Sequence, residues 1–330
     1  MRISTLTLAT IATTLTACGG GGGSGQVEKV ASNPITYQAV ATEGELISYT
    51  VDTTALTYSY RIVESAYNKT GATGSGQLTR NSDGTYTPSG FNGKVSILES
   101  GLLLGAIYED LNNDNVREVV PIIGVSNPIT TTTDAAGVYN FISRQCGTFC
   151  TNYYGTVKVL ADGSWTSCVL DNLSAVNYSC QSSASGTITS FASGRATLMH
   201  NGISAGSMLI FKDAGSGQKV VLLDLNGQSS LGKGAIFAAS QSLPSSADGD
   251  WTYLHTNGTN GVVRVTGTTF TDTGKTAYGT SYNLPGSFTR DQPWNGFIRT
   301  ASGATIMPTG SGLYAGYFGA TGSMSIGVKR

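Results

Sequence analysis

The chain has 330 residues, a formal net charge of −1 and 12% charged residues, which is about half the share of an ordinary soluble domain. Lysine and arginine form no cluster along it, so the composition excludes a protein that neutralises the phosphates of a nucleic acid. The 44 glycines, and 16 tyrosines against 10 phenylalanines, are typical of many short strands joined by tight turns. We therefore predict an all-β fold and no nucleic-acid partner.

The first segment has the features of an export signal. Arg2 is followed by an apolar run over residues 3–15, which is too short to span a bilayer, since that needs about 20 apolar residues, and has the length of a signal-peptide core. The next residues, Leu15-Thr16-Ala17-Cys18, resemble the lipobox of bacterial lipoproteins. The resemblance implies a lipoprotein signal peptide over residues 1–17, cleavage before Cys18, and attachment of diacylglycerol and a further acyl chain such as palmitate to Cys18.

Residues 18–34 form the predicted tether. They begin with the acylated cysteine and a run from Gly19 to Gly25 that is interrupted only by Ser24, and such a run behaves as a flexible linker. Several acyl chains bind a membrane far more tightly than one. Because Gly19 replaces the aspartate that resembles an inner-membrane retention signal, we predict an outer-membrane anchor, with the protein facing the periplasm or the cell surface. The alternative is a plain signal peptide with an accidental cysteine.

Strand-like segments then recur in three predicted repeats, which cover residues 35–130, 131–243 and 244–330. The first of these repeats is divergent. The second is the clearest, with an alternating opening over 137–142 and a hairpin turn at Asp162-Gly163, because Asp-Gly between apolar runs favours a tight hairpin. The third repeat opens in the same way over 249–254. We align 296–299 of the third repeat with 186–189 of the second.

Each repeat offers about six to eight short antiparallel strands in sequence, and a sheet of this kind removes its exposed edges by closing into a barrel. The openings Gly137-x-Tyr139 and Gly249-x-Trp251 resemble the first strand of lipocalin-type barrels. We therefore predict an all-β protein of tandem up-and-down sheets, each a small lipocalin-like β-barrel. The alternatives are β-sandwiches and propeller blades.

Of the five cysteines, four lie beyond Cys18, and all four fall in the second repeat. In an exported chain this pattern indicates two disulfides. Among the three pairings, we favour Cys146–Cys150 and Cys168–Cys180, because each closes a short loop. The alternatives are four free thiols and a four-thiolate zinc site. A zinc site of this kind uses pairs separated by two to four residues, and the second pair is spaced too widely for it.

One acidic segment offers the oxygen ligands of a calcium loop. Asp110, Asn112, Asp114 and Glu118 supply oxygens at alternate or nearby positions, as a hard cation requires. However, Asn115 stands where such a loop has its glycine. The alternative is a hairpin turn, which Asn and Asp also favour. Ca²⁺ is the only cofactor that the sequence suggests.

A serine-hydrolase motif occurs once, in the G-x-S-x-G pattern from Gly202 through Ser204 to Gly206. That motif requires a strand-to-helix turn and a histidine base. Here strands are predicted on both sides, and His200 and His255 are the only histidines. We interpret the segment as a glycine-rich turn, assign no catalytic residue, and predict that the protein is not an enzyme.

The aromatic side chains suggest two roles. Trp165 and Trp251 lie in predicted strands and favour a place in the barrel cores. Trp294 lies in a predicted turn, so we take it as a candidate exposed aromatic that binds a sugar or a partner protein.

Three functional hypotheses follow. The first is a lipid-anchored envelope protein whose non-catalytic β modules have a structural role or bind a protein or glycan. The alternative is a carrier of a small apolar ligand, because eight-stranded barrels have room for one. Against it, the inward-facing pairs Val157/Val159 and Val221/Leu223 are predicted to fill the second barrel. The third is an envelope hydrolase.

Overall fold

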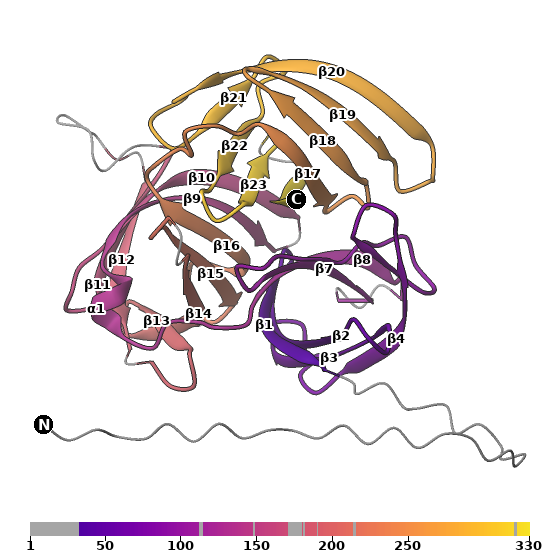
Figure 1. Cartoon of the computed structure of the whole chain (residues 1–330). Coiled ribbons are helices and arrows are strands. Elements are labelled where there is room, and N and C mark those ends of the chain that lie inside the picture. Colours follow the sequence, from indigo (N-terminus) through magenta and orange to yellow (C-terminus); the bar gives the residue numbers. More distant parts are fainter. Residues whose placement is uncertain are drawn as a thin grey trace, which may run out of the picture. The chain divides into compact units, whose positions relative to one another are not determined.

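A computed structural model describes residues 33–111, 115–147, 149–170, 180, 182–189, 191–213, 216–319 and 322–330. Cys18 and the predicted tether up to residue 32 lie outside the described residues. Antiparallel strands make up nearly all of the regular structure, and the one described helix is α1 (Thr132–Ala135). Within the described part of the chain, no helix is both long enough and apolar enough to cross a membrane. The all-β prediction is confirmed (Figure 1).

The first eight strands form a nearly closed barrel, which we call barrel 1. Its strands are β1 (Ile35–Ala41), β2 (Glu45–Asp52), β3 (Thr57–Ser65), β4 (Thr73–Arg80), β5 (Tyr86–Pro88), β6 (Ser96–Ile97), β7 (Leu102–Glu109) and β8 (Glu118–Val125). They run in the order β5-β4-β3-β2-β1-β8-β7-β6. An isolated bridge between Tyr86 and Val95 connects the two edges of this sheet.

The next eight strands form a closed barrel, barrel 2. Its strands are β9 (Gly137–Cys146), β10 (Cys150–Val159), β11 (Ser164–Val169), β12 (Ser182–Ile188), β13 (Ala196–His200), β14 (Ile203–Lys212), β15 (Lys219–Asn226) and β16 (Lys233–Ser240). Neighbours in sequence pair in turn, and β16 pairs with β9 to close the barrel. The predicted hairpin turn at Asp162-Gly163 joins β10 to β11.

The last eight strands form a second closed barrel, barrel 3. Its strands are β17 (Gly249–His255), β18 (Asn260–Thr266), β19 (Thr269–Lys275), β20 (Ser281–Arg290), β21 (Ile298–Thr300), β22 (Thr305–Pro308), β23 (Leu313–Tyr317) and β24 (Met324–Lys329). Strand β24 pairs with β17. The prediction of tandem up-and-down β-barrels is thus confirmed.

One detail of the predicted alignment is wrong. Residues 296–299 were aligned with the fourth strand of barrel 2, but they enter β21, which is the fifth strand of barrel 3. The fourth strand is β20, which the sequence analysis missed because it contains Pro285 and Gly286, and these residues argue against an interior strand. Proline is tolerated there because β20 pairs with β21 only over its last three residues, so Pro285 has a neighbouring strand on one side only.

The first-strand aromatics close one end of barrels 2 and 3 by the same contact. The Tyr139 hydroxyl donates to the carbonyl oxygen of Ala135 at 2.5 Å, and the Trp251 indole donates to that of Ala247 at 2.8 Å. In each case the acceptor lies four residues earlier, in the segment that enters the barrel. The lipocalin-like first strand was predicted from these residues, and this contact is the structural role they share.

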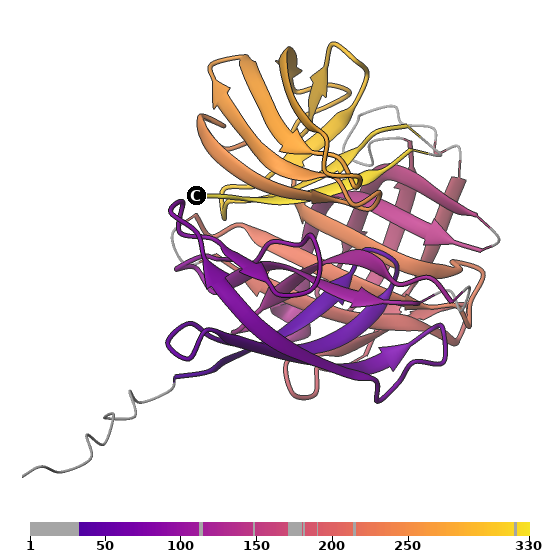
Figure 2. The same ribbon diagram turned by 90° about the vertical axis from the view of Figure 1, so that its right-hand side faces the viewer.

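Each barrel has its own inner core, and a fourth apolar cluster is shared by all three. Strand β7 shows how this arises, since successive residues of a strand face opposite sides. Leu103 packs inside barrel 1, whereas Leu102 and Leu104 belong to the shared cluster. Phe237 of barrel 2 and Ile326 of barrel 3 are fully buried in the same cluster. Figures 1 and 2 show the three barrels packed side by side.

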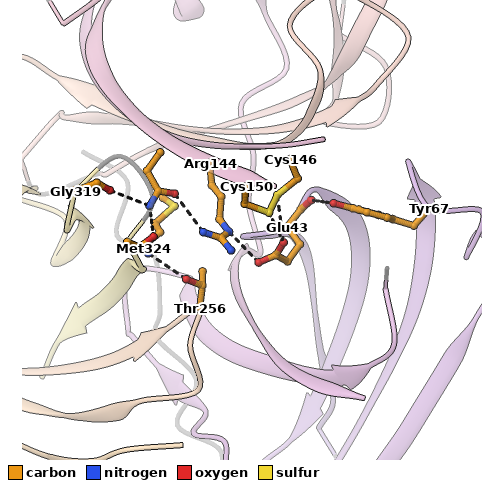
Figure 3. A network of polar contacts seen from close by, with 10 residues as sticks. Glu43, Tyr67, Arg144, Cys146, Cys150, Thr256, Gly319 and Met324 are labelled. Carbon is orange, nitrogen blue, oxygen red and sulfur yellow. Dashed lines mark hydrogen bonds and ion pairs between the residues drawn. A yellow bond between two sulfur atoms is a disulfide. The ribbon is translucent and has the colours of Figure 1, made fainter. Parts of the chain in front are cut away.

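A polar network also joins the three barrels (Figure 3). Arg144 of β9 donates to the Glu43 carboxylate of the β1–β2 turn at 2.9 Å, and it also donates to the Asn152 side chain at 3.4 Å. Asn152 of β10 in turn donates to the carbonyl oxygen of Gly322 in barrel 3 at 2.5 Å. These contacts fix the orientation of the barrels, which apolar packing alone specifies less well.

Two disulfides strengthen barrel 2, and their pairing is the one that short loops favour. Cys146 is bonded to Cys150 across the β9–β10 hairpin. Cys168 of β11 is bonded to Cys180, which lies just before β12. The second bond fixes the chain at the point where it returns to the sheet.

Candidate functional site

Barrels 2 and 3 each enclose a mainly apolar cavity. The cavity of barrel 2 has a volume of about 500 Å³ and that of barrel 3 about 460 Å³. Both volumes lie within the range of sites that bind small organic molecules. These two cavities are the candidate functional sites of the protein.

Barrel 1 has the same fold, but tyrosines occupy much of its interior, and a smaller hollow of about 310 Å³ remains beside Tyr58 and Tyr60. The Tyr49 ring stacks between those of Tyr58 and Tyr60, with centroid distances of 5.9 and 6.3 Å, and Tyr37 is buried beside them. In barrel 2, small residues such as Ala184 occupy part of the lining instead. The difference between the barrels is therefore one of side-chain volume at inward-facing positions.

The expectation that large inward residues fill barrel 2 is wrong. Val157, Val159, Val221 and Leu223 do face inward, but all four line the cavity rather than close it. Eight strands make the barrel wide enough that side chains of this size leave space for one small ligand.

Both cavities lie beside an incomplete seam between the fourth and fifth strands. Strands β12 and β13 pair over Gly186–Ile188 only, and β20 and β21 pair over Phe288–Arg290 only. The unpaired part of the fourth strand lines the cavity in each case, with residues 182–184 in barrel 2 and 284–286 in barrel 3. Among the described residues, each cavity is therefore bordered by a stretch of barrel wall without strand pairing.

The polar groups in the cavity of barrel 2 are uncharged or already bound. His200 is buried, and its Nδ1 lies 2.8 Å from the carbonyl oxygen of Ser185. Its Nε2 lies 3.2 Å from the Ser230 hydroxyl. The ring also lies beside Trp165, with a centroid distance of 5.9 Å. This cavity offers an apolar body with a few hydroxyl groups at one end.

The cavity of barrel 3 is more aromatic and holds a carboxyl group. Asp272 of β19 lines it and accepts a hydrogen bond from the Tyr253 hydroxyl at 2.7 Å. Burial raises the pKa of Asp272, and this hydrogen bond opposes the shift. Tyr253 also contacts the Tyr282 hydroxyl, and burial together with both partners raises the pKa of Tyr253.

Glycine makes room for this phenol pair. A Cβ atom at Gly274 would lie 2.6 Å from the Tyr282 hydroxyl and 2.8 Å from that of Tyr253. A Cβ atom at Gly261 would likewise lie 2.8 Å from the Tyr253 hydroxyl. All three distances are shorter than real contacts of Cβ atoms, so glycine at these two positions is required for Tyr253 and Tyr282 to meet beside Asp272.

His255 lies at the wall of the same cavity and is uncharged at neutral pH. Burial lowers the pKa of its imidazole to about 4. The ring packs edge-on against Tyr253, with centroids 4.8 Å apart, and against Phe318 at 5.0 Å. It therefore adds apolar surface and a neutral hydrogen-bonding edge to the cavity.

Trp294 is not the exposed aromatic that its place in a turn predicted. Its side chain is partly buried and packs against the shared core, with ring centroids 5.7 Å from Tyr154 and 5.3 Å from Phe297. The indole N–H donates to the Asn140 side chain at 2.9 Å. The prediction failed because this turn of barrel 3 packs against barrel 2, a contact that local sequence does not reveal.

The predicted calcium ligands are described only in part. Asn112 and Asp114 lie outside the described residues, so the calcium site stays a prediction. The Asp110 carboxylate accepts a hydrogen bond from the backbone of Asn115 at 3.2 Å, and Asn115 has a left-handed φ of 66°. Glu118 begins β8, where it is exposed. The described part of the segment thus has the geometry of a turn.

The serine of the G-x-S-x-G pattern lies near the start of β14, and the chain continues as a strand. Ser204 accepts a hydrogen bond from the Asn226 side chain at 3.2 Å. The nitrogens of His200 contact Ser185, Ser230 and Asn201 instead. The strand-to-helix turn of a nucleophile elbow is therefore not formed here.

Within the described ranges, one group of residues brings three metal-binding side chains close together, and it consists of Glu43, Cys146 and Cys150. Because the two cysteines form a disulfide, they offer no thiolate, and Glu43 is held by Arg144. We do not assign a metal to this group.

Sequence reasoning missed Asp272, although a signal was present. Strand β19 places Phe270, Asp272 and Gly274 on one face, and this face is directed into the barrel. A carboxyl group between an aromatic residue and a glycine on an inward face is unusual, because charged groups are seldom buried without a partner. The sequence alone does not show that Asp272 faces the barrel interior, because this depends on the register of β19 against β18 and β20.

Comparison with protein-family models finds no match to this chain. Comparison with curated proteins finds no similar sequence either. The functional argument therefore depends on the cavities themselves.

Proposed function

We propose that this protein is a lipid-anchored outer-membrane protein whose barrels 2 and 3 each bind one small apolar ligand. The observation that supports binding is a contrast within one chain. Tyrosines occupy much of barrel 1 and leave a hollow of about 310 Å³, whereas its two neighbours have larger, mainly apolar cavities of about 500 and 460 Å³. The lipobox-like segment and the glycine tether support the anchor. The carrier hypothesis thus takes precedence over a structural or macromolecule-binding role.

The stability of the barrels is consistent with this role. Barrels 2 and 3 each contribute outward-facing residues to the shared core as well as inward-facing residues to their own core, so we expect both cavities to stay open without a ligand. A preformed apolar site binds with little cost of ordering the protein. The incomplete seams provide the entry route.

The test is a titration of residues 32–330, which form one compact unit, with the apolar fluorescent probe N-phenyl-1-naphthylamine. The cavity variants are Val157→Trp in barrel 2 and Val263→Trp in barrel 3, since both valines line a cavity. Val262→Trp is the matched control, because its neighbouring position on β18 faces outward.

We expect two probe molecules per wild-type chain, one in each single cavity variant, and none in the double variant. Val262→Trp should keep both sites. Equal binding by the wild type and the double variant would show that the probe binds an outer surface, and the proposal would then be rejected.

A further inference from the structure

We propose that the cavity of barrel 3 selects amphiphiles with a protonated amine, whose ammonium group binds the Asp272 carboxylate while the apolar part fills the cavity. This inference rests on the proposed function and names the ligand class of one of its two sites.

The carboxyl group of Asp272 has room for a further partner. One oxygen accepts the hydrogen bond from Tyr253, and the other accepts none from the described residues. None of the ion pairs within the described ranges includes Asp272. His255 cannot neutralise it at pH 7, because burial keeps its imidazole uncharged. Burial without a cation disfavours the charged form of this carboxyl group, and an ammonium ligand would supply the cation that stabilises it.

The surrounding surface suits an organic cation. Aromatic rings attract a cation through their faces, most strongly that of tryptophan, and the cavity wall is rich in them. The aromatic residues that line it are Trp251, Phe270, Phe288, Tyr314 and Phe318. An anionic ligand such as a fatty acid would instead meet the Asp272 carboxyl group and be repelled.

Barrel 2 provides an internal contrast. Its cavity is lined by no Asp, Glu, Lys or Arg among the described residues, and His200 already has partners at both nitrogens. We therefore expect barrel 2 to accept neutral apolar molecules without preference for an amine. The two sites of one chain thus differ in the charge of the ligand that they select.

The size of the ligand follows from the volume. A cavity of about 460 Å³ has the volume of roughly 15 water molecules, at about 30 Å³ each in the liquid. Because bonded carbon atoms lie closer together than separate water molecules, a ligand with somewhat more than 15 non-hydrogen atoms still fits. Decylamine, decanol and decanoic acid are three probes within this limit that share a chain and differ in head group. Decylamine is protonated at neutral pH, as a lysine side chain is.

The experiment uses residues 32–330 with Val157→Trp, so that barrel 3 holds the remaining site. Displacement of N-phenyl-1-naphthylamine gives the affinity for each of the three probes at pH 7. Asp272→Asn removes the charge but keeps an oxygen that accepts from Tyr253. Asp250→Asn is the matched control, because Asp250 lies on the same barrel and pairs with the exposed Arg264 at 2.8 Å.

We expect decylamine to bind at least tenfold more tightly than decanol, which corresponds to about 1.4 kcal/mol, and decanoic acid to bind most weakly. Asp272→Asn should abolish the preference for decylamine over decanol, while Asp250→Asn should leave this preference intact. Equal binding of decylamine and decanol, or a preference that survives Asp272→Asn, would overturn the inference and leave the proposed function standing. Binding of none of the probes would overturn both.

Discussion

The clearest perturbation of this fold is ionisation of a carboxyl group buried between barrels 1 and 2. Glu45 of β2 is 0% exposed. One of its oxygens accepts from the Ser65 hydroxyl at 2.8 Å, and the other has no hydrogen-bond partner among the described groups. Asp224 of β15, which packs against β2, is 1% exposed and also has one oxygen without a partner. Two carboxyl groups therefore share an interface with little solvent.

Burial raises the pKa of Glu45 from its ordinary 4.5 to about 8, although Ser65 and Lys233 oppose the shift. Burial, with Glu45 nearby, also raises the pKa of Asp224 well above its ordinary value. One pKa unit corresponds to about 1.4 kcal/mol, so ionising Glu45 in the folded protein costs on the order of 5 kcal/mol. Because the folded state holds this proton more tightly than the unfolded state, the protein loses stability as the pH rises from about 5 to about 8.

The assay is urea unfolding of residues 32–330 between pH 5 and pH 9, for the wild type and for Glu45→Gln. Glutamine mimics the protonated carboxyl group, so the variant should lack this loss and become the more stable protein above pH 8. Glu99→Gln, at an exposed carboxyl group, is the control and should follow the wild type. If the difference between the wild type and Glu45→Gln does not change with pH, the assignment of a protonated Glu45 is refuted.

Three further predictions concern the packing of the barrels and the anchor. Gly44→Ala should lower the free energy of unfolding by about 2–4 kcal/mol. The left-handed φ of 86° at Gly44 disfavours alanine, and a Cβ atom there would clash with the backbone of Gly234. Gly84→Ala is the control, because Gly84 has a similar φ of 81° but open space around it, so this variant should show the smaller backbone effect alone. Phe237→Ala should cost about 3–5 kcal/mol in urea unfolding, because Phe237 is fully buried in the shared core. Cys18→Ala should move the protein from the membrane fraction to the soluble fraction, and retention in membranes would contradict the anchor.

Much of the fold follows from local patterns in the sequence. The Asp162-Gly163 turn and the alternating runs on either side of it specify a hairpin by chemistry that acts over a few residues. Disulfide pairing followed from loop length in the same way. Strand β20 was missed because Pro285 argues against a strand, and only the seam beside β21 explains why it is tolerated.

The site depends on contacts between distant residues and could not be predicted in the same way. Val157 was correctly expected to face inward, but whether such residues fill a barrel depends on the sum of all inward volumes. Trp294 was misplaced because its partners Asn140 and Tyr154 come from another barrel. Likewise, strands that turn their outward face to the shared core, such as β7 and β15, are apolar on both faces, and this pattern obscures which side of the strand lines the barrel interior.

The most direct test of the account is native mass spectrometry of residues 32–330 equilibrated with N-phenyl-1-naphthylamine in the absence of detergent. The account predicts a chain that carries two probe molecules, a Val157→Trp chain that carries one, and loss of all bound probe when the protein is denatured. A wild-type chain that stays bare, or one that carries as many molecules as the Val157→Trp/Val263→Trp double variant, would contradict the claim that barrels 2 and 3 are ligand sites.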